Sequence, residues 1–132
     1  MRVFRLLLTA LVLTACSDST GPEATVVGSY SLRTINEQAP PVTIYQDSQG
    51  RVEITGGSVN LNADGTFTDR TDIRIVSGTT SLADTEIASG TYVHSGGTVQ
   101  LRTSDGDVYS MSFSGGNTLT QTIEGFVVVY RK

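Results

Sequence analysis

Short segments rich in Val, Ile, Thr and Tyr recur about every ten residues from Val26 to the end of the chain, with Gly, Asn, Asp or Ser between them. This pattern is typical of β-strands joined by tight turns, because β-branched and aromatic residues suit a pleated sheet and glycine accepts the positive φ of hairpins. The pattern predicts eight or nine strands. The candidates are 26–35, 42–47, 51–62, 66–76, 85–94, 98–103, 107–114, 117–123 and 126–131.

Along most of these segments apolar residues occupy every second position, which indicates that one face of each strand is buried. The apolar positions that share a face are Tyr30 with Leu32, Val59 with Leu61, Val99 with Leu101, Tyr109 with Met111 and Phe113, and Leu119 with Ile123. A sheet of this kind tends to curl and close, because closure removes its exposed edges. We therefore expect an all-β fold, a small antiparallel up-and-down barrel.

The sequence also predicts a bulge in one strand and the position of the last strand. The pair Gly56-Gly57 predicts a bulge within the segment 51–62. The last segment, 126–131, is apolar on both faces, and we expect it to close the barrel against 26–35. The alternatives are that the tether that precedes the domain, or a short helical turn around 81–85, covers this last strand.

The first residues have the pattern of an export signal. Arg2 and Arg5 precede an apolar run over 6–13, and Thr14-Ala15 supplies the small residues that a signal peptidase requires. A run of this length is too short to cross a hydrocarbon core about 30 Å thick. We therefore predict a cleaved signal peptide over 1–15.

The tetrad Leu13-Thr14-Ala15-Cys16 contains the only cysteine of the chain and resembles the lipobox of bacterial lipoproteins. The resemblance implies that Cys16 carries diacylglycerol, becomes the first mature residue and anchors the protein to a membrane. A free thiol or an intermolecular disulfide is the alternative for an unpaired cysteine in an exported protein. Ser17 follows the cysteine, which by resemblance to the sorting rule of many Gram-negative bacteria favours the outer membrane within the cell envelope.

Composition limits the size and the partners of the mature protein. The polar segment after Cys16 contains Gly21-Pro22, so 16–25 is predicted to be the lipidated cysteine with a flexible tether, and 26–132 the barrel domain. Removal of residues 1–15 leaves 117 residues, enough for one domain, and moves the formal charge from -4 to -6. This acidic balance argues against nucleic acid as a partner. We expect a monomer.

Three motifs resemble bacterial lipocalin-like lipoproteins. They are Gly28-Ser29-Tyr30, Leu61-Asn62-Ala63-Asp64-Gly65-Thr66-Phe67 and Ser89-Gly90-Thr91-Tyr92. Tyr30 stands where lipocalins carry a tryptophan, and the chain has no tryptophan. The resemblance implies an eight-stranded calycin-type barrel, which either holds one small ligand or is filled by side chains.

Residues with catalytic or metal-binding chemistry are few. His94 is the only histidine and ends a strand, with no nucleophile elbow or second ligand pattern to support a triad or a zinc site. Asp64-Gly65 and Asp105-Gly106-Asp107 lack the ligand spacing of an EF-hand and are interpreted as turns. The chain is therefore expected to have no enzymatic activity, cofactor or metal.

Asp69 is the best indication of a polar cavity. If Phe67, Ile73 and Ile75 point into the barrel, Asp69 and Thr71 do so as well, and a buried carboxylate must be hydrogen-bonded, paired or solvated. The alternatives are that Asp69 lies in water at the barrel mouth, or that a bulge reverses its face.

These patterns favour a binding module for a small hydrophobic molecule. The candidate ligand-binding residues are Tyr30, Asp69, Tyr92, Tyr109 and Met111. The same aromatic and apolar positions also suit an ordinary core. The alternative function is therefore an envelope scaffold or protein-interaction lipoprotein with a filled barrel.

Overall fold

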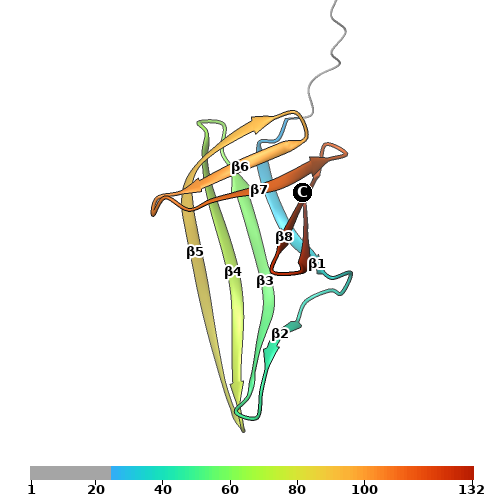
Figure 1. The fold of residues 1–132 in the computed structure, drawn as a ribbon, viewed down its shortest axis with the longest axis vertical. Helices are drawn as coiled ribbons and strands as arrows, with labels where there is room; N and C mark the ends of the chain where they lie inside the picture. The colour runs from blue at the N-terminus through green and yellow to red at the C-terminus, as the bar shows by residue number, and fades with distance from the viewer. Residues whose placement is uncertain (1–24) are drawn as a thin grey trace, which may run out of the picture.

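The computed structural model describes residues 25–132, which form nine antiparallel strands and no helix (Figure 1). From β2 to β9 each strand pairs with the next along the chain through a short turn, as the hairpin-rich sequence predicted, whereas β1 and β2 do not pair with each other. The strands are β1 (Gly28–Ile35), β2 (Val42–Gln46), β3 (Arg51–Leu61), β4 (Thr66–Ser77), β5 (Thr80–Ser95), β6 (Thr98–Thr103), β7 (Val108–Ser114), β8 (Thr118–Ile123) and β9 (Phe126–Arg131).

Eight of the nine strands close into a barrel, which confirms the predicted fold class. Closure comes from β1, which pairs on one side with β9 and on the other with the second half of β3, where Tyr30 lies opposite Val59. The ninth strand, β2, pairs only with the first half of β3. The prediction that 126–131 closes the barrel against 26–35 is therefore also confirmed.

The strands β3, β4 and β5 are longer than the rest and extend beyond the barrel (Figure 1). Together with β2 they form an open sheet at one end of the molecule. We call this sheet the arm; it comprises β2 and residues 51–57, 70–77 and 80–89. The barrel end beside the arm is called the open end.

Two details differ from the sequence prediction. The strand expected over 85–94 starts at Thr80, so the region around 81–85 is extended and contains no helical turn. Residue-by-residue pairing with β4, from Ser77 opposite Thr80 onward, imposes this conformation. The bulge expected at Gly56-Gly57 lies one position earlier, because the register shifts between Ile54 and Gly56.

The interior of the barrel away from the arm is filled by side chains. The largest fully buried residues are Tyr30, Ile35, Val59, Leu61, Phe67, Val99, Leu101, Met111 and Leu119. The Tyr30 ring meets Phe113 edge-on, and its hydroxyl donates to the carbonyl of Val26. Burial of each large apolar side chain stabilises the fold by about 1.5–3 kcal/mol.

The predicted apolar face of β8 is only partly correct. Leu119 is buried, but Ile123 is 46% exposed, and Gln121 between them is 6% exposed. Ile123 is the last residue of β8, at the turn into β9, where little of the barrel remains to cover it. The core face of β8 therefore becomes a pocket wall at this end.

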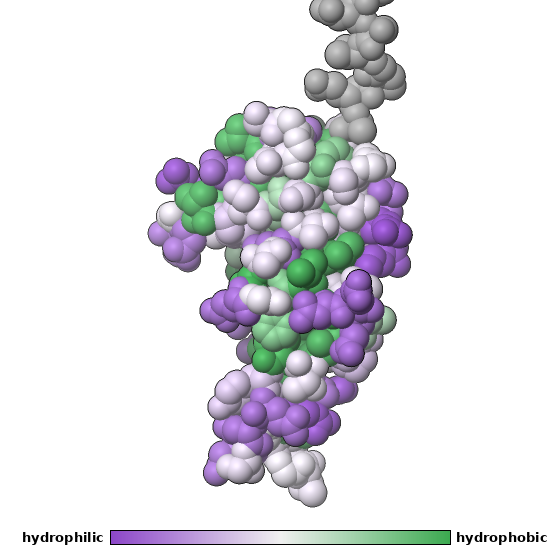
Figure 2. All heavy atoms as spheres, turned by 45° about the vertical axis from the view of Figure 1, so that its right-hand side comes forward, coloured by the Kyte–Doolittle hydropathy of each residue, from purple (hydrophilic) through white to green (hydrophobic). Residues whose placement is uncertain are grey.

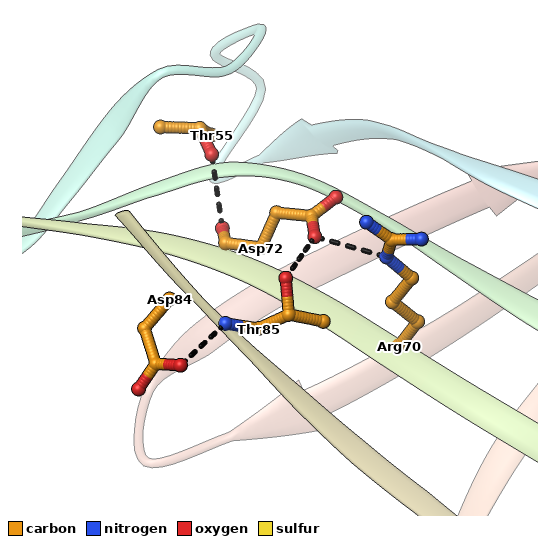
Figure 3. A network of polar contacts seen from close by, with 5 residues as sticks. All are labelled: Thr55, Arg70, Asp72, Asp84 and Thr85. Atoms are coloured by element: carbon orange, nitrogen blue, oxygen red, sulfur yellow. Dashed lines mark hydrogen bonds and ion pairs between the residues drawn. The ribbon is translucent and has the colours of Figure 1, made fainter. Parts of the chain in front are cut away.

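The outer face of the arm is a charged surface in which arginines pair with carboxylates. Glu53 accepts hydrogen bonds from Arg51 Nε at 2.8 Å and Arg74 Nε at 2.7 Å, and these arginines hold the pKa of Glu53 below its usual range. Asp72 accepts from Arg70 Nε and from the hydroxyl of Thr85, both at 2.9 Å (Figure 3).

Within residues 25–132 there is no helix with the length and hydropathy needed to cross a membrane. The predicted signal peptide, Cys16 and the predicted tether up to residue 24 lie outside the described residues.

Candidate functional site

A pocket of about 550 Å³ lies at the open end of the barrel, and we call it the polar pocket. Most of its lining residues are inward-facing residues of β4, β7, β8 and β9, just beyond the packed core. Asp69 follows Phe67 at a spacing of two, Tyr109 precedes Met111, and Gln121 follows Leu119. The full lining is Asp69, Thr71, Tyr109, Ser110, Gln121, Thr122, Ile123, Glu124 and Tyr130.

Asp69 is the central polar group of this pocket. The Tyr109 hydroxyl donates to Asp69 Oδ2 at 3.0 Å, whereas Oδ1 is buried and has no hydrogen-bond partner among the described residues. Burial raises the pKa of the Asp69 carboxyl, and the hydrogen bond from Tyr109 opposes this effect. An unpaired buried oxygen costs free energy, so a ligand that donates to it would stabilise the folded chain.

Two tyrosines are held in the protonated state beside Asp69. Burial and the neighbouring Asp69 carboxylate raise the pKa of both Tyr109 and Tyr130. Each phenol therefore keeps its proton at neutral pH and remains a hydrogen-bond donor with an apolar ring. The arrangement can hold a molecule that has both a polar group and an apolar body.

In the described part of the chain, the pocket wall contains two acidic side chains and no basic one to pair with them. Asp69 and Glu124 both line it, and among the described residues no Lys, Arg or His side chain does so. The three ion pairs found within residues 25–132 all lie on the outer face of the arm, at Glu53 and Asp72. A cationic or hydrogen-bond-donating group is therefore the head group that this pocket suits best.

A second pocket, of about 310 Å³, lies on the other side of the β8–β9 turn, and we call it the apolar pocket. Ile123 and Glu124 line both pockets, so this turn is the wall between them. Its lining is Ile35, Ile44, Tyr45, Ile54, Ile123, Glu124, Phe126 and Val128. Figure 2 shows hydrophobic surface between the barrel and the polar tip of the arm.

The structure brings together two of the five candidate ligand-binding residues. Asp69 and Tyr109 meet in the polar pocket. Tyr30 and Met111 are 0% and 1% exposed and belong to the packed core. Tyr92 is half-buried near the β3–β4 turn, where its hydroxyl donates to the carbonyl of Asn62 at 2.7 Å. The binding roles of these five residues stay predictions.

Five pocket residues were not identified from the sequence: Ser110, Gln121, Thr122, Glu124 and Tyr130. Gln121 has the same pattern that identified Asp69, because it is a polar residue between apolar ones on an inward face. Tyr130 alternates with the buried Val128 and therefore had the appearance of ordinary core. Glu124 lies in a turn and carried no periodic signal.

The other residues considered for chemistry have structural contacts. His94 Nε2 lies 2.7 Å from the carbonyl of Gly96, and its ring meets Phe113 edge-on. Asp64 Oδ1 accepts from the backbone and hydroxyl of Thr66, as expected for a turn. No group of three or more His, Cys, Asp or Glu side chains in the described part of the chain could hold a metal ion.

Comparison with known proteins found no matching family model, no matching curated protein and no matching solved structure. The function is therefore inferred from the geometry of the two pockets and the arm.

Substitution of Asp69 by asparagine is expected to stabilise the protein at neutral pH. Because the pKa of Asp69 is raised in the folded state, the folded chain binds this proton more tightly than the unfolded chain does. Wild-type stability should thus fall as the pH rises from the ordinary value of 3.8 through the raised value, and the uncharged amide removes that loss. Urea unfolding across this pH range measures the effect.

Asp72→Asn is the matched control, on the same strand but on the opposite face. Arg70 and Thr85 lower the pKa of Asp72, so its contribution is present above the ordinary pKa and is lost as the pH falls. This variant should therefore be less stable than wild type at neutral pH. A destabilised Asp69→Asn variant at neutral pH would contradict the burial argument.

Proposed function

We propose that this protein is a cell-envelope lipoprotein of the lipocalin-like kind, whose barrel binds a small amphipathic molecule and catalyses no reaction. The sequence motifs support an anchor through lipid on Cys16 and the outer membrane as its location. The expected state is a monomer. The barrel fold is compatible with ligand binding in its interior.

The observation that carries the binding function is the Asp69–Tyr109 pair, with Asp69 Oδ1 unpaired among the described residues, in a pocket of about 550 Å³. Small-molecule sites are commonly of this size and combine a few convergent polar groups with apolar walls. The head group would donate to Asp69, and the apolar body would lie against Tyr109, Tyr130 and Ile123. The ligand is therefore an amine or alcohol with a hydrophobic part, rather than a hydrocarbon alone.

Native mass spectrometry of the full chain purified from its own cells tests this function. We expect a small molecule in stoichiometric amount, which solvent extraction then releases for identification. Asp69→Ala should lose it, since the acceptor for the head group is gone. Asp105→Ala, which alters an exposed acid in the β6–β7 turn, should retain it.

Comparison of Asp69→Ala with Asp69→Asn identifies the head group. A cation needs the carboxylate charge, so both variants should release it. An uncharged donor can still bind the amide oxygen of the asparagine variant, so only the alanine variant should release it. An empty wild-type protein, or full occupancy in Asp69→Ala, would contradict binding at this pocket.

A second function, contact with another envelope protein, is favoured by a different observation. The interior of the barrel away from the arm is filled by side chains. The strands β3, β4 and β5 extend far beyond the closed part of the barrel as the arm (Figure 1). Tyr45, Ile75 and Leu82, which share the face of the arm that continues the barrel interior, are 57%, 39% and 61% exposed. Isolated exposed apolar residues are ordinary, but several on one extended sheet suit a protein contact.

A further inference from the structure

The strand β5 has one long edge without a partner strand among the described residues. It pairs with β4 along its length from Thr80 to Thr91, but with β6 only from Gly90 to Ser95. The last contact before the free part is the hydrogen bond from Ser104 N–H to the carbonyl of Ser89, at 2.9 Å. Residues 80–89 therefore have a neighbouring strand on one side only.

The backbone groups that face outward at this edge can be assigned. Successive residues of a strand direct their N–H and C=O groups to alternate sides, and Ser89 directs its carbonyl to the β6 side. Ser81, Ala83, Thr85 and Ile87 therefore direct theirs to the free side, and we call residues 81–87 the open edge. In agreement, the Thr85 N–H donates to the Asp84 carboxylate at 2.8 Å and not to a strand (Figure 3).

The open edge is acidic on one face. Leu82, Asp84 and Glu86 lie opposite Ile75, Ile73 and Thr71 of β4, on the face that continues the barrel interior. No salt bridge to Asp84 or Glu86 is present within residues 25–132. The arginines of β3 and β4 cannot neutralise them, because all three lie on the outer face of the arm.

This charge pattern argues against a second copy of the chain as the occupant. Antiparallel pairing of two open edges places residues of the same face opposite one another. When the two edges pair around residues 84–86, Asp84 of one chain lies opposite Glu86 of the other, or each acid lies opposite its own copy. Like charges directly opposite one another are destabilising. Acidic side chains on an edge strand commonly prevent such self-pairing.

We propose that the open edge of β5 binds an extended basic segment of a partner protein as an added strand. Lysine or arginine side chains at alternate positions of that segment lie opposite Asp84 and Glu86. The backbone of the segment forms hydrogen bonds with the outward N–H and C=O groups of residues 81–87. The Asp84 carboxylate then releases the N–H of Thr85 and pairs with a cationic side chain of the segment. This inference gives the protein-contact function its surface and does not depend on the polar pocket.

The test uses the full chain in detergent micelles and a labelled synthetic peptide of alternating lysine and valine, as long as the edge. Fluorescence anisotropy measures binding at low salt. The control peptides replace a central valine by proline, or every lysine by glutamate. We expect binding of the first peptide only, because proline keeps the charge but cannot form the strand.

Two variants test the charge pairing and the backbone hydrogen bonding separately. Asp84→Asn with Glu86→Gln should weaken peptide binding by roughly tenfold, through lost cross-strand charge pairs. Ala83→Pro removes one outward N–H while leaving both carboxylates, and should abolish binding. Circular dichroism verifies that each variant is folded, and the peptide controls stand even where a variant is not.

Equal binding of the proline-containing peptide would overturn the proposal, since charge attraction alone would then explain it. Absence of binding by the lysine–valine peptide would also overturn it. Asp69→Ala should leave peptide binding unchanged, so failure of this proposal and failure of ligand binding at the polar pocket are separate results.

Discussion

Replacement of Gly90 by alanine is expected to prevent the barrel from forming. Gly90 lies where β5 leaves the arm and enters the barrel, opposite Phe67 of β4 and Thr103 of β6. A Cβ atom there would lie 1.9 Å from the carbonyl oxygen of Arg102 and 2.9 Å from the Cα of Thr103. These are backbone atoms, so no rotation of a side chain relieves the overlap.

The cost should approach the whole stability of the domain. To make room for the methyl group, β6 must separate from β5, which removes Leu101 from the core that it shares with Phe67. Substitutions that force such a change are expected to cost more than about 4 kcal/mol, against a total of roughly 5–15 kcal/mol for a small domain. Circular dichroism and urea unfolding measure the loss.

Gly97→Ala is the control for this prediction. A Cβ atom at Gly97 would have only an ordinary contact, 3.6 Å from the carbonyl oxygen of Phe113. This variant should unfold cooperatively with a midpoint close to that of wild type. The same behaviour in Gly90→Ala would show that β5 and β6 can separate locally without loss of the barrel.

Strands could be predicted from the sequence wherever one face is buried. In Val59 with Leu61 and in Val99 with Leu101 the burial itself produces the alternation. The first half of β5 has no such signal, because residues 80–87 are exposed on both faces. Its extension is determined by pairing with β4 through the turn at Gly78, which has a φ of 58°. Pairing of this kind leaves little trace in local composition.

The candidate site was predictable only in part, for a related reason. Alternation identifies which side chains point inward, and it selected Asp69 and Tyr109 correctly as inward-facing. It selected Tyr30 and Met111 by the same rule, although these lie in the filled part of the barrel. Whether an inward-facing residue lies in the core or in the pocket depends on its position along the barrel axis. That position is determined by the stagger between strands that are far apart in the sequence.

The two faces of the arm differ in how their acidic side chains are paired. Its outer face pairs Arg51 and Arg74 with Glu53, which gives a stable polar surface. Its other face leaves Asp84 and Glu86 without cations from the described residues. The separation follows from the period of two in a strand, because alternate side chains belong to opposite faces. A basic partner would therefore be directed to the face that adjoins the polar pocket.

Replacement of Cys16 by serine is expected to move the protein from the membrane fraction to the soluble fraction. One acyl chain gives only marginal membrane binding, at about 0.8 kcal/mol per buried CH₂, whereas two or three chains hold a protein essentially permanently. Serine has no thiol to receive diacylglycerol. The remaining apolar run over 6–13 is too short to span a bilayer, so it does not replace the anchor.

The barrel should stay folded in this variant, since its buried cluster runs from Val26 to Tyr130. Fractionation of cells, incorporation of labelled palmitate and circular dichroism together measure the three parts of the prediction. Thr20→Ala, a change in the predicted tether, should remain lipidated and in the membrane fraction. A Cys16→Ser protein that stays in the membrane fraction would mean that another contact anchors it, and the barrel surface would then be the first place to search. A soluble, folded variant would instead show that the barrel needs the lipid only for its location, and the polar pocket and the open edge could then be studied free of the membrane.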